Sequence, residues 1–200
     1  MGSVDPTTLI VYDGCSSDYA AWTRQDRPNK FRKRMIRRLP KGGSVLDLGC
    51  GAGWDSAAFL ASGLQAIPVD ASAGLAREAE RLLGIPVRRL PFDQLDEPAV
   101  HDGAWASFSL QHVPRDALPD VLSRIARALK AGGWLYVGVQ EGEQTRRDRL
   151  GRLYCHYRRV DLEARLSEAG FGDISCETSS GIGYDGSRNQ HLNMEARKLG

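Results

Sequence analysis

The residues best suited to bind a ligand lie in one segment, residues 45–55, where an apolar run containing Asp47 leads into three alternate glycines. These glycines are Gly49, Gly51 and Gly53, and a helical pattern starts directly after them. Glycine allows the backbone to turn tightly and to approach a ligand, and the N-terminus of the following helix presents free N–H groups with a partial positive charge. The segment therefore predicts a turn between a strand and a helix that binds an anionic group such as a carboxylate.

Two further residues narrow the type of ligand. In the dinucleotide fingerprint G-x-G-x-x-G the third glycine would fall at position 54, but this chain has Trp54, which argues against a nicotinamide cofactor. Asp70 ends the next apolar run, where a carboxylate can accept hydrogen bonds from both hydroxyls of a ribose. The alternative for Asp70 is a cap for the helix that starts at Ser72.

The elements that must position these residues follow from the hydrophobic pattern. Short apolar runs of strand length alternate with helical patterns, which is typical of βαβ units and a mainly parallel sheet. The expected strands are residues 44–49, 65–69, 86–90, 103–109 and 134–140. The expected helices are residues 54–62, 72–83, the segment from Pro114 to Gly132, and residues 160–169. Two last strands, residues 171–178 and 189–197, are separated only by a glycine-rich loop and must therefore pair antiparallel.

In these features the chain resembles the class I, Rossmann-like methyltransferases that use S-adenosyl-L-methionine. The resemblance rests on the glycine turn, on Leu90-Pro91-Phe92-Asp93, on residues 102–114, and on the turn Leu-Lys-Ala-Gly-Gly-Trp before the fifth strand. It implies an α/β fold with a doubly wound, mainly parallel sheet of seven strands in the order 3-2-1-4-5-7-6. The last strand is antiparallel, helices cover both faces, and the cofactor is S-adenosyl-L-methionine.

The resemblance also implies which residues bind the cofactor. The expected set is Asp47, Gly49, Cys50, Gly51, Gly53, Asp55, Asp70, Ala71, Phe92, Asp93, Ser107 and Phe108. Many relatives have an acidic residue well before the Leu-Pro-Phe run, whereas here the strand itself leads into that run. A helix cap therefore remains the alternative for Asp93.

Methyl transfer from a sulfonium is an in-line displacement that needs no metal, and the enzyme chiefly holds donor and acceptor in line while excluding water. A base helps when the acceptor carries a proton, and His112, Tyr12, Tyr19 and His156 are the candidates. We assign catalysis to His112 and Tyr19, and substrate binding to Tyr12, Trp22, His112 and His156. The acceptor pocket is expected between residues 12–22 and the polar segment 141–157. Packing within a loop or a helix is the alternative for His112 and Trp22.

A small molecule is the expected acceptor, methylated on nitrogen or oxygen, with sulfur as a further option. Residues 24–38 carry eight basic residues in fifteen positions, a pattern that an RNA backbone would attract. They alternate with Phe31, Met35, Ile36 and Leu39 at helical spacing, which favours the solvated face of an amphipathic helix. An RNA, tRNA or peptide methyltransferase is the first alternative, and a catalytically silent interaction domain with this fold is the second.

The bulk composition sets the frame for these expectations. A chain of 200 residues with 42% hydrophobic residues suits one domain, with residues 1–40 as a helical lid and 41–200 as the core. There is no run of 18 apolar residues and no signal peptide, so we expect a cytoplasmic protein that does not bind membranes. Four scattered cysteines suggest reduced thiols and no metal site, and monomer and homodimer remain equally open.

Overall fold

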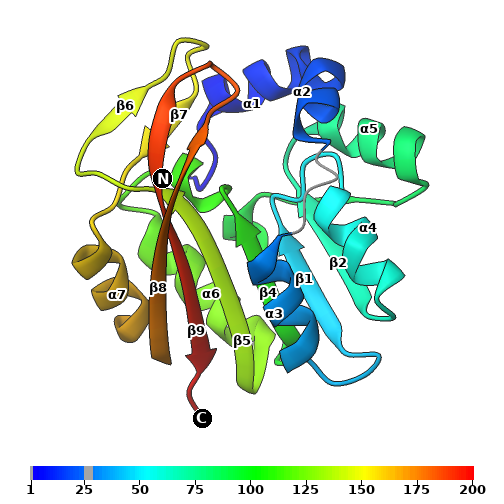
Figure 1. Cartoon of the computed structure of the whole chain (residues 1–200), viewed down its shortest axis with the longest axis vertical. Coiled ribbons are helices and arrows are strands. Elements are labelled where there is room, and N and C mark those ends of the chain that lie inside the picture. Colours follow the sequence, from blue (N-terminus) through cyan, green and yellow to red (C-terminus); the bar gives the residue numbers. More distant parts are fainter. Residues whose placement is uncertain (1, 25–28) are drawn as a thin grey trace.

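The centre of the molecule is a seven-stranded sheet in the order β3-β2-β1-β4-β5-β9-β8, seen in a computed structural model that describes residues 2–24 and 29–200 (Figure 1). Its strands are β1 (Ser44–Leu48), β2 (Gln65–Asp70), β3 (Arg88–Arg89), β4 (His101–Ser107), β5 (Leu129–Gln140), β8 (Phe171–Ile182) and β9 (Arg188–Lys198). Strand β9 lies between β5 and β8 and pairs antiparallel with both. The predicted fold and strand order are confirmed, because the predicted sixth and seventh strands are β8 and β9.

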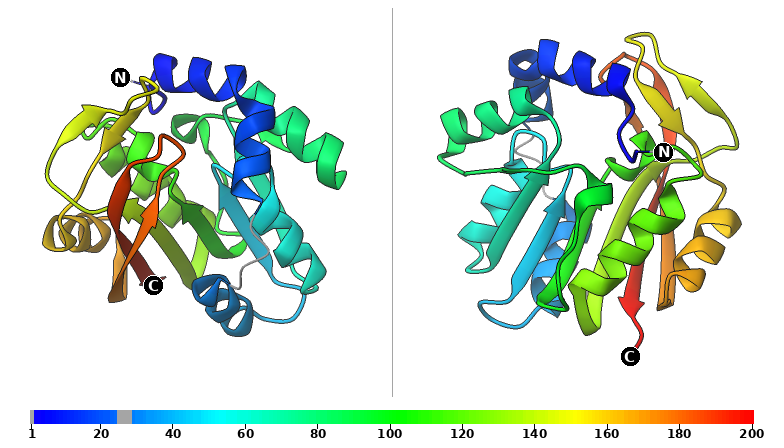
Figure 2. Two further views of the ribbon diagram at one scale, coloured as in Figure 1. Left: turned by 45° about the horizontal axis from the view of Figure 1, so that its top comes forward. Right: turned by 180° about the vertical axis from the view of Figure 1, so that it is seen from behind.

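The helices follow the strands on both faces of the sheet. They are α1 (Pro6–Gly14), α2 (Ser16–Thr23), α3 (Lys30–Arg38), α4 (Trp54–Ala61), α5 (Ala73–Leu83), α6 (Leu118–Ala128) and α7 (Arg159–Glu168). Helices α3 and α4 lie on one face and α6 and α7 on the other, as the two views of Figure 2 show. The short helices α1 and α2 cross above the carboxyl ends of the parallel strands.

Side-chain alternation along the strands decides which residues meet which layer. In β1, Val45 packs with α3 and α4, whereas Leu46 and Leu48 join the larger core under α6. The same alternation places Trp105 of β4 and Tyr136 of β5 on the α3 face, with their rings stacked 3.9 Å apart. The same alternation continues in β9 and decides which of its side chains reach the site.

The structure differs from the expected elements in the segment after β5. The polar residues 141–157 contain a two-stranded hairpin, β6 (Thr145–Arg147) and β7 (Leu153–Cys155), that forms a sheet of its own. Strand β6 is exposed at all three positions, so it has no apolar alternation by which the sequence could predict it. The hairpin stands at the same edge of the sheet as α1 and the turn between β8 and β9 (Figure 1).

None of the helices in the described parts of the chain is long and apolar enough to span a membrane.

Candidate active site

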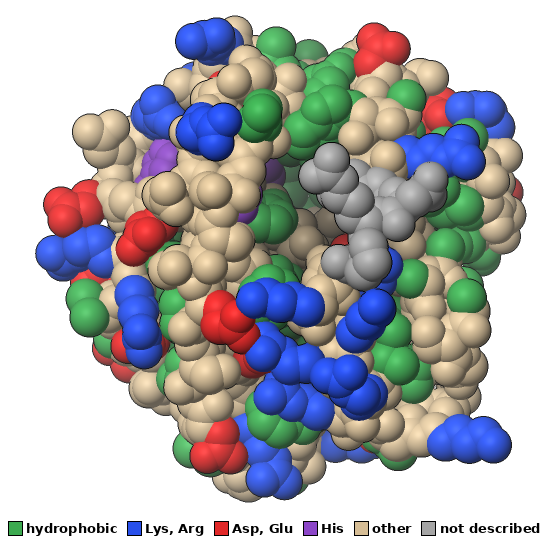
Figure 3. Space-filling model, viewed as in Figure 1, with side chains coloured by type: hydrophobic (Ala, Val, Ile, Leu, Met, Phe, Trp, Pro, Cys, Tyr) green, Lys and Arg blue, Asp and Glu red, His purple; other side chains and the backbone are tan. Residues whose placement is uncertain are grey.

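A cavity of about 1150 Å³ opens at the carboxyl edge of the sheet, on the face that α3 and α4 cover. Strand residues of one parity line it: Asp47 of β1, Ser107 of β4, Gln140 of β5, and His191 and Asn193 of β9. The surface is hollowed at this place, with apolar side chains inside and basic side chains gathered along α3 beside it (Figure 3). Ligand pockets commonly measure roughly 300–1000 Å³, so this one has room for a cofactor and an acceptor together.

A second cavity of about 100 Å³ adjoins the large one. The two share Tyr12 and Tyr19, and also the backbone turn at Gly49 and Gly51. Ser107 and Phe108 belong to both walls as well. The predicted cofactor residues are thus divided between two connected spaces, with Asp70, Ala71 and Phe92 on the smaller one and Asp47, Cys50 and Asp55 on the larger one.

The glycine turn after β1 requires glycine for two separate reasons. Gly49, Gly51 and Gly53 have φ angles of 69°, 58° and 79°, in the left-handed region that side chains disfavour. In addition, a Cβ atom on Gly49 would lie only 2.4 Å from the Cβ of Ser109. Gly53 lines neither cavity and instead starts α4, close to Ala79 of α5. The backbone at Gly49 and Gly51 therefore forms a cradle that fits a cofactor held by main-chain groups.

The acidic residues around this cradle are tied to the protein. Asp47 is 2% exposed and accepts a hydrogen bond of 2.6 Å from the Ser56 hydroxyl. Burial, together with the nearby Asp55 carboxylate, raises the pKa of Asp47. Asp55 accepts a hydrogen bond of 2.8 Å from the indole N–H of Trp105 and pairs with Arg32 of α3. Asp55 therefore attaches α3 to the sheet as well as lining the cavity.

Asp70 and Asp93 differ in how open they are to a ligand. Asp70 accepts hydrogen bonds of 2.8 Å from the backbone N–H groups of Gly51 and Ser72, and burial raises its pKa. Each carboxylate oxygen has a second lone pair, so Asp70 can still accept from a ligand. Asp93 lines neither cavity, and its carboxylate accepts from the backbone N–H and the hydroxyl of Ser3. Its neighbour Phe92 does line the smaller cavity.

The exit of β4 has a strained backbone. Phe108 adopts a φ of 58°, which is uncommon for a residue with a bulky side chain. Its N–H donates to the carbonyl of Gly138 at 2.9 Å, and its ring lies 4.7 Å from the ring of His191. Cys50, which also lines the large cavity, is a free thiol whose pKa is raised by burial.

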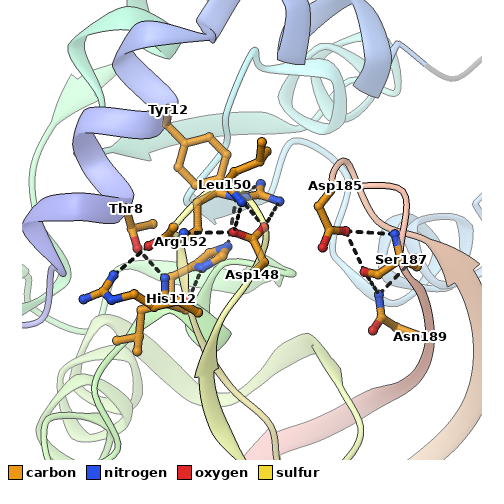
Figure 4. Close-up of polar contacts among 12 residues, drawn as sticks. Thr8, Tyr12, His112, Asp148, Leu150, Arg152, Asp185, Ser187 and Asn189 are labelled. Carbon is orange, nitrogen blue, oxygen red and sulfur yellow. Dashed lines mark hydrogen bonds and ion pairs between the residues drawn. The ribbon is translucent and has the colours of Figure 1, made fainter.

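His112 lies in a hydrogen-bonded chain that Figure 4 shows. Its Nδ1 is 2.6 Å from the carbonyl of Leu153, which can only accept, so Nδ1 carries the proton. Nε2 then accepts from the Tyr12 hydroxyl at 3.0 Å, and that hydroxyl accepts from Arg152 at 2.9 Å. Burial lowers the pKa of His112 to about 4. Both of its nitrogens are occupied, and His112 lines only the smaller cavity.

Arg152 is a site residue that the sequence reasoning missed. Its side chain is 1% exposed, and Nε and Nη2 donate to Asp148 at 2.9 and 2.7 Å. The guanidinium also lies 5.1 to 5.6 Å from the ring centres of Tyr12, Tyr154 and Tyr184. Only the placement of the polar segment 141–157 beside the pocket hinted at such a residue, since the sequence pattern does not show that an arginine is buried.

The aromatic residues of α2 and the β8–β9 turn form a second wall. Trp22 is 41% exposed, and the centre of its ring lies 5.9 Å from that of Tyr19 and 5.4 Å from that of Tyr184. Tyr19 also packs edge-on against Tyr12 at 5.0 Å. From the segment 12–22, the residues Tyr12, Tyr19 and Trp22 line the large cavity. We call Tyr19, Trp22 and Tyr184 the aromatic wall.

His156 lies outside both cavities. Its Nδ1 is 2.9 Å from the carbonyl of Gln144, and its Nε2 is 2.9 Å from Oε1 of Gln140. The ring is 6% exposed and holds the β6–β7 hairpin against β5. Its role in substrate binding stays a prediction for which this position gives no support.

The sequence pattern predicts that the basic residues of α3 are solvated, but several of them pair with carboxylates instead. Arg34 and Arg38 lie 2.9 Å from the carboxylate of Glu195, which is itself 5% exposed in its side chain. Lys30 and Arg34 also pair with Glu177 of β8. Within the described residues, four basic side chains of α3 thus face carboxylates of the same chain, including the pair between Arg32 and Asp55. Arg27 of the basic cluster lies outside the described residues.

Solved structures of similar shape include three methyltransferases. A Burkholderia thailandensis 1,6-didemethyltoxoflavin-N1-methyltransferase, crystallised with 1,6-didemethyltoxoflavin and S-adenosylhomocysteine, is 26% identical; the match has a TM-score of 0.74 and covers 96% of this chain and 88% of that one. A Methanosarcina mazei S-adenosylmethionine-dependent methyltransferase is 19% identical, with a TM-score of 0.73 and coverages of 83% and 97%. A Haemonchus contortus phosphoethanolamine N-methyltransferase, bound to phosphomonomethylethanolamine and S-adenosylhomocysteine, is 17% identical, with a TM-score of 0.73 and coverages of 96% and 57%. No curated protein matches the chain.

The fold, the glycine cradle and these similarities define an enzyme of the class I methyltransferases that uses S-adenosyl-L-methionine. A family model described as a methyltransferase domain matches residues 19–175, which is more than half of the chain. The chain belongs to that methyltransferase family.

Proposed function

We propose that this methyltransferase transfers a methyl group to a nitrogen or oxygen atom of a small molecule, with sulfur as a less favoured acceptor atom. The observation that carries the proposal is the large cavity, whose walls come from the glycine turn, the aromatic wall and the polar edge of β9. A space of this size between secondary-structure elements suits a cofactor and a small acceptor. Two of the similar enzymes were crystallised with small molecules, which supports the same class of acceptor.

The cofactor supplies an electrophilic methyl group on a sulfonium. We propose that the backbone at Gly49 and Gly51 holds its carboxylate end and that Asp70 accepts from the ribose hydroxyls. Ala71 and Phe92 then lie beside the adenine, and Ser107 and Phe108 lie beside the methionine part. The remaining residues of the proposed cofactor site belong to the glycine turn and to α4, and they are Cys50, Gly53 and Asp55. Asp93 can accept from the adenine amino group only if it moves toward the cofactor, because it lines neither cavity.

The rest of the site acts on the acceptor. Trp22 and Tyr19 offer flat apolar faces that exclude water from the reacting atoms, which favours displacement at the methyl carbon. Tyr12 is held by Arg152 and His112, so its position on this wall is fixed. We keep the interpretation that residues 1–40 act as a lid on a core of residues 41–200 and that the protein works in the cytoplasm.

A nucleic acid is the less favoured acceptor. Four of the eight basic residues that suggested it, Lys30, Arg32, Arg34 and Arg38, each face a carboxylate of the same chain. A basic side chain that is already paired with a carboxylate neutralises a phosphate less well, so it releases fewer counterions from the nucleic acid and contributes less to the affinity.

The test combines calorimetry with product detection. S-adenosylhomocysteine should bind with micromolar affinity and NAD should not, and Asp70→Ala should weaken the first by roughly 10-fold, as expected for lost hydrogen bonds to a charged group. Release of S-adenosylhomocysteine is then measured with 1,6-didemethyltoxoflavin, total RNA and a peptide mixture as acceptors. Methylation of RNA or peptide in preference to the small molecule would refute the proposal.

A control pair addresses the acceptor wall directly. Trp22→Ala should raise KM for the small acceptor without changing the affinity for S-adenosylhomocysteine. Val160→Ala removes an exposed apolar side chain from α7, away from the cavity, and should change neither quantity.

A further inference from the structure

The four histidines of the chain differ in whether their ring nitrogens are free. His101 contacts Ser44 and Glu97, and both nitrogens of His112 and of His156 have protein partners, as described above. The ring nitrogens of His191 make no hydrogen bond with any residue that the structure describes, and the residue lines the large cavity. An imidazole without a protein partner at a cavity wall is available to a ligand.

The position of His191 follows from the parity of β9. It pairs with Gln140 across β5 and with Ser179 across β8, and its side chain shares the cavity face with Asn193. Its ring packs edge-on against Phe108, 4.7 Å away. A Cβ on Gly181 would lie 2.8 Å from Cε1 of His191, so the glycine at that position makes room for the ring.

Among the described residues, no charged side chain faces the ring of His191 from the elements around it. The residues next to it on β5, β8 and the exit of β4 are Gln140, Ser179 and Phe108, none of which titrates. The charged residues farther along this face of β8 and β9, Glu177 and Glu195, are paired with α3. Burial lowers the pKa of His191, so the ring is neutral and able to take a proton near pH 7.

We propose that His191 is the general base that removes the proton from the acceptor atom, in place of His112. This inference rests on the proposed function, because it requires an acceptor bound in the large cavity. It also narrows the acceptor class to small molecules whose methylated nitrogen or oxygen carries a proton that is lost in the reaction.

The step balances without any further reactant. The lone pair of the acceptor atom forms the new bond to the methyl carbon while the carbon–sulfur bond breaks, and that electron pair stays on sulfur as S-adenosylhomocysteine is formed. The proton of the acceptor passes to an unprotonated ring nitrogen of His191. The resulting imidazolium returns the proton to water at the opening of the cavity.

The first test measures turnover of 1,6-didemethyltoxoflavin against pH. His191→Gln should lower kcat by about 100-fold, the lower end of the effect of a general base, and should remove the decline of kcat at low pH. Its affinity for S-adenosylhomocysteine should stay within twofold of the wild type. His191→Ala should regain activity when imidazole is added. The matched control is His101→Gln, at the opposite edge of the sheet, which should retain both kcat and the decline at low pH.

The second test does not depend on turnover. In nitrogen NMR spectra of the ¹⁵N-labelled chain, the ring of His191 should titrate with a pKa below 6.5, whereas His112 should stay a fixed neutral tautomer above pH 5. A His191 ring locked in one tautomer overturns the inference, as does an unchanged kcat in His191→Gln. If the wild type does not methylate the small molecule, that result counts against the proposed acceptor, and the NMR titration alone decides the availability of His191.

Discussion

Replacing Asp148 by asparagine removes the carboxylate that is hydrogen-bonded to the buried Arg152. Both side chains are nearly inaccessible, at 8% and 1% exposure, and they meet through two hydrogen bonds at 2.9 and 2.7 Å. The backbone N–H groups of Leu150 and Arg152, which donate to Asp148 Oδ1, can still donate to the asparagine carbonyl. The asparagine amide nitrogen then faces Nε and Nη2 of Arg152 and cannot accept from them, so the substitution removes the negative charge together with both hydrogen bonds to the guanidinium. An uncompensated buried charge costs about 3–5 kcal/mol, so we expect Asp148→Asn to lose that much stability.

The assay is urea unfolding followed by far-ultraviolet circular dichroism, together with a thermal melt. For a chain of this length, 1 kcal/mol corresponds to roughly 2–4 °C in Tm, so the melting temperature should fall by about 6–20 °C. The second variant is Asp148→Asn combined with Arg152→Met, which removes the stranded charge. Buried ion pairs can often be replaced by apolar residues without loss, so the double variant should regain most of the stability.

Two results would refute this reasoning. A single variant within 1 kcal/mol of the wild type would mean that Arg152 reaches water or another acceptor without Asp148. A double variant that is less stable than the single one would mean that the guanidinium stabilises the aromatic residues around it more than its burial costs. Turnover of the acceptor also distinguishes the two results. The Tyr12 hydroxyl loses the hydrogen bond donated by Arg152 only when Arg152 is absent or displaced.

Two further expectations concern the cofactor cradle and pH. Gly49→Ala should lower the affinity for S-adenosylhomocysteine at least 10-fold. The control is Gly63→Ala, where φ is 79° but no atom of the described residues lies within 4 Å of the added Cβ, so the substitution should cost only the roughly 1–2 kcal/mol of stability of a left-handed alanine. Equal affinities of the two variants in calorimetry would refute the steric argument. His112 has a folded pKa of about 4 against 6.5 when unfolded, so the unfolded chain binds the extra proton and stability falls as pH drops from 6.5 toward 4. Wild type should lose about 2–3 kcal/mol more than His112→Gln between pH 7 and 4, measured by urea unfolding. Parallel losses would show that folding does not lower the pKa of His112.

The sequence predicted the layered fold well because apolar periodicity records which side chains the core buries. Strand β4 and helix α6 have regular apolar patterns, and the short final loop correctly predicted the antiparallel pairing of β8 and β9. The order of the seven strands was implied by the resemblance to the class I methyltransferases. Boundaries shifted where pattern and pairing disagree. Strand β5 starts at Leu129, before the glycines that were expected to end the helix, because Leu129 already pairs with His101 of β4.

The polar part of the site was harder to predict, because burial of a polar residue depends on partners far away in the sequence. Arg152 looks like any surface arginine until Asp148 and Tyr12 surround it. Arg34 has the helical spacing of a solvated residue, but the carboxylates it meets come from β8 and β9. His191 left a usable signal, because β9 alternates between polar and apolar residues from 191 to 196, and the polar set must face a ligand or a partner.

The place of β9 in the sheet affects how the enzyme comes into existence. Residues 188–198 follow β8 in the chain, yet they fill a slot between β5 and β8. A chain interrupted before residue 188 would leave both neighbours as open edges, which are sites of aggregation. It would also lack one wall of the acceptor cavity. Synthesis of this segment therefore completes the sheet and the site at the same moment, so that unfinished chains are inactive and exposed to quality control.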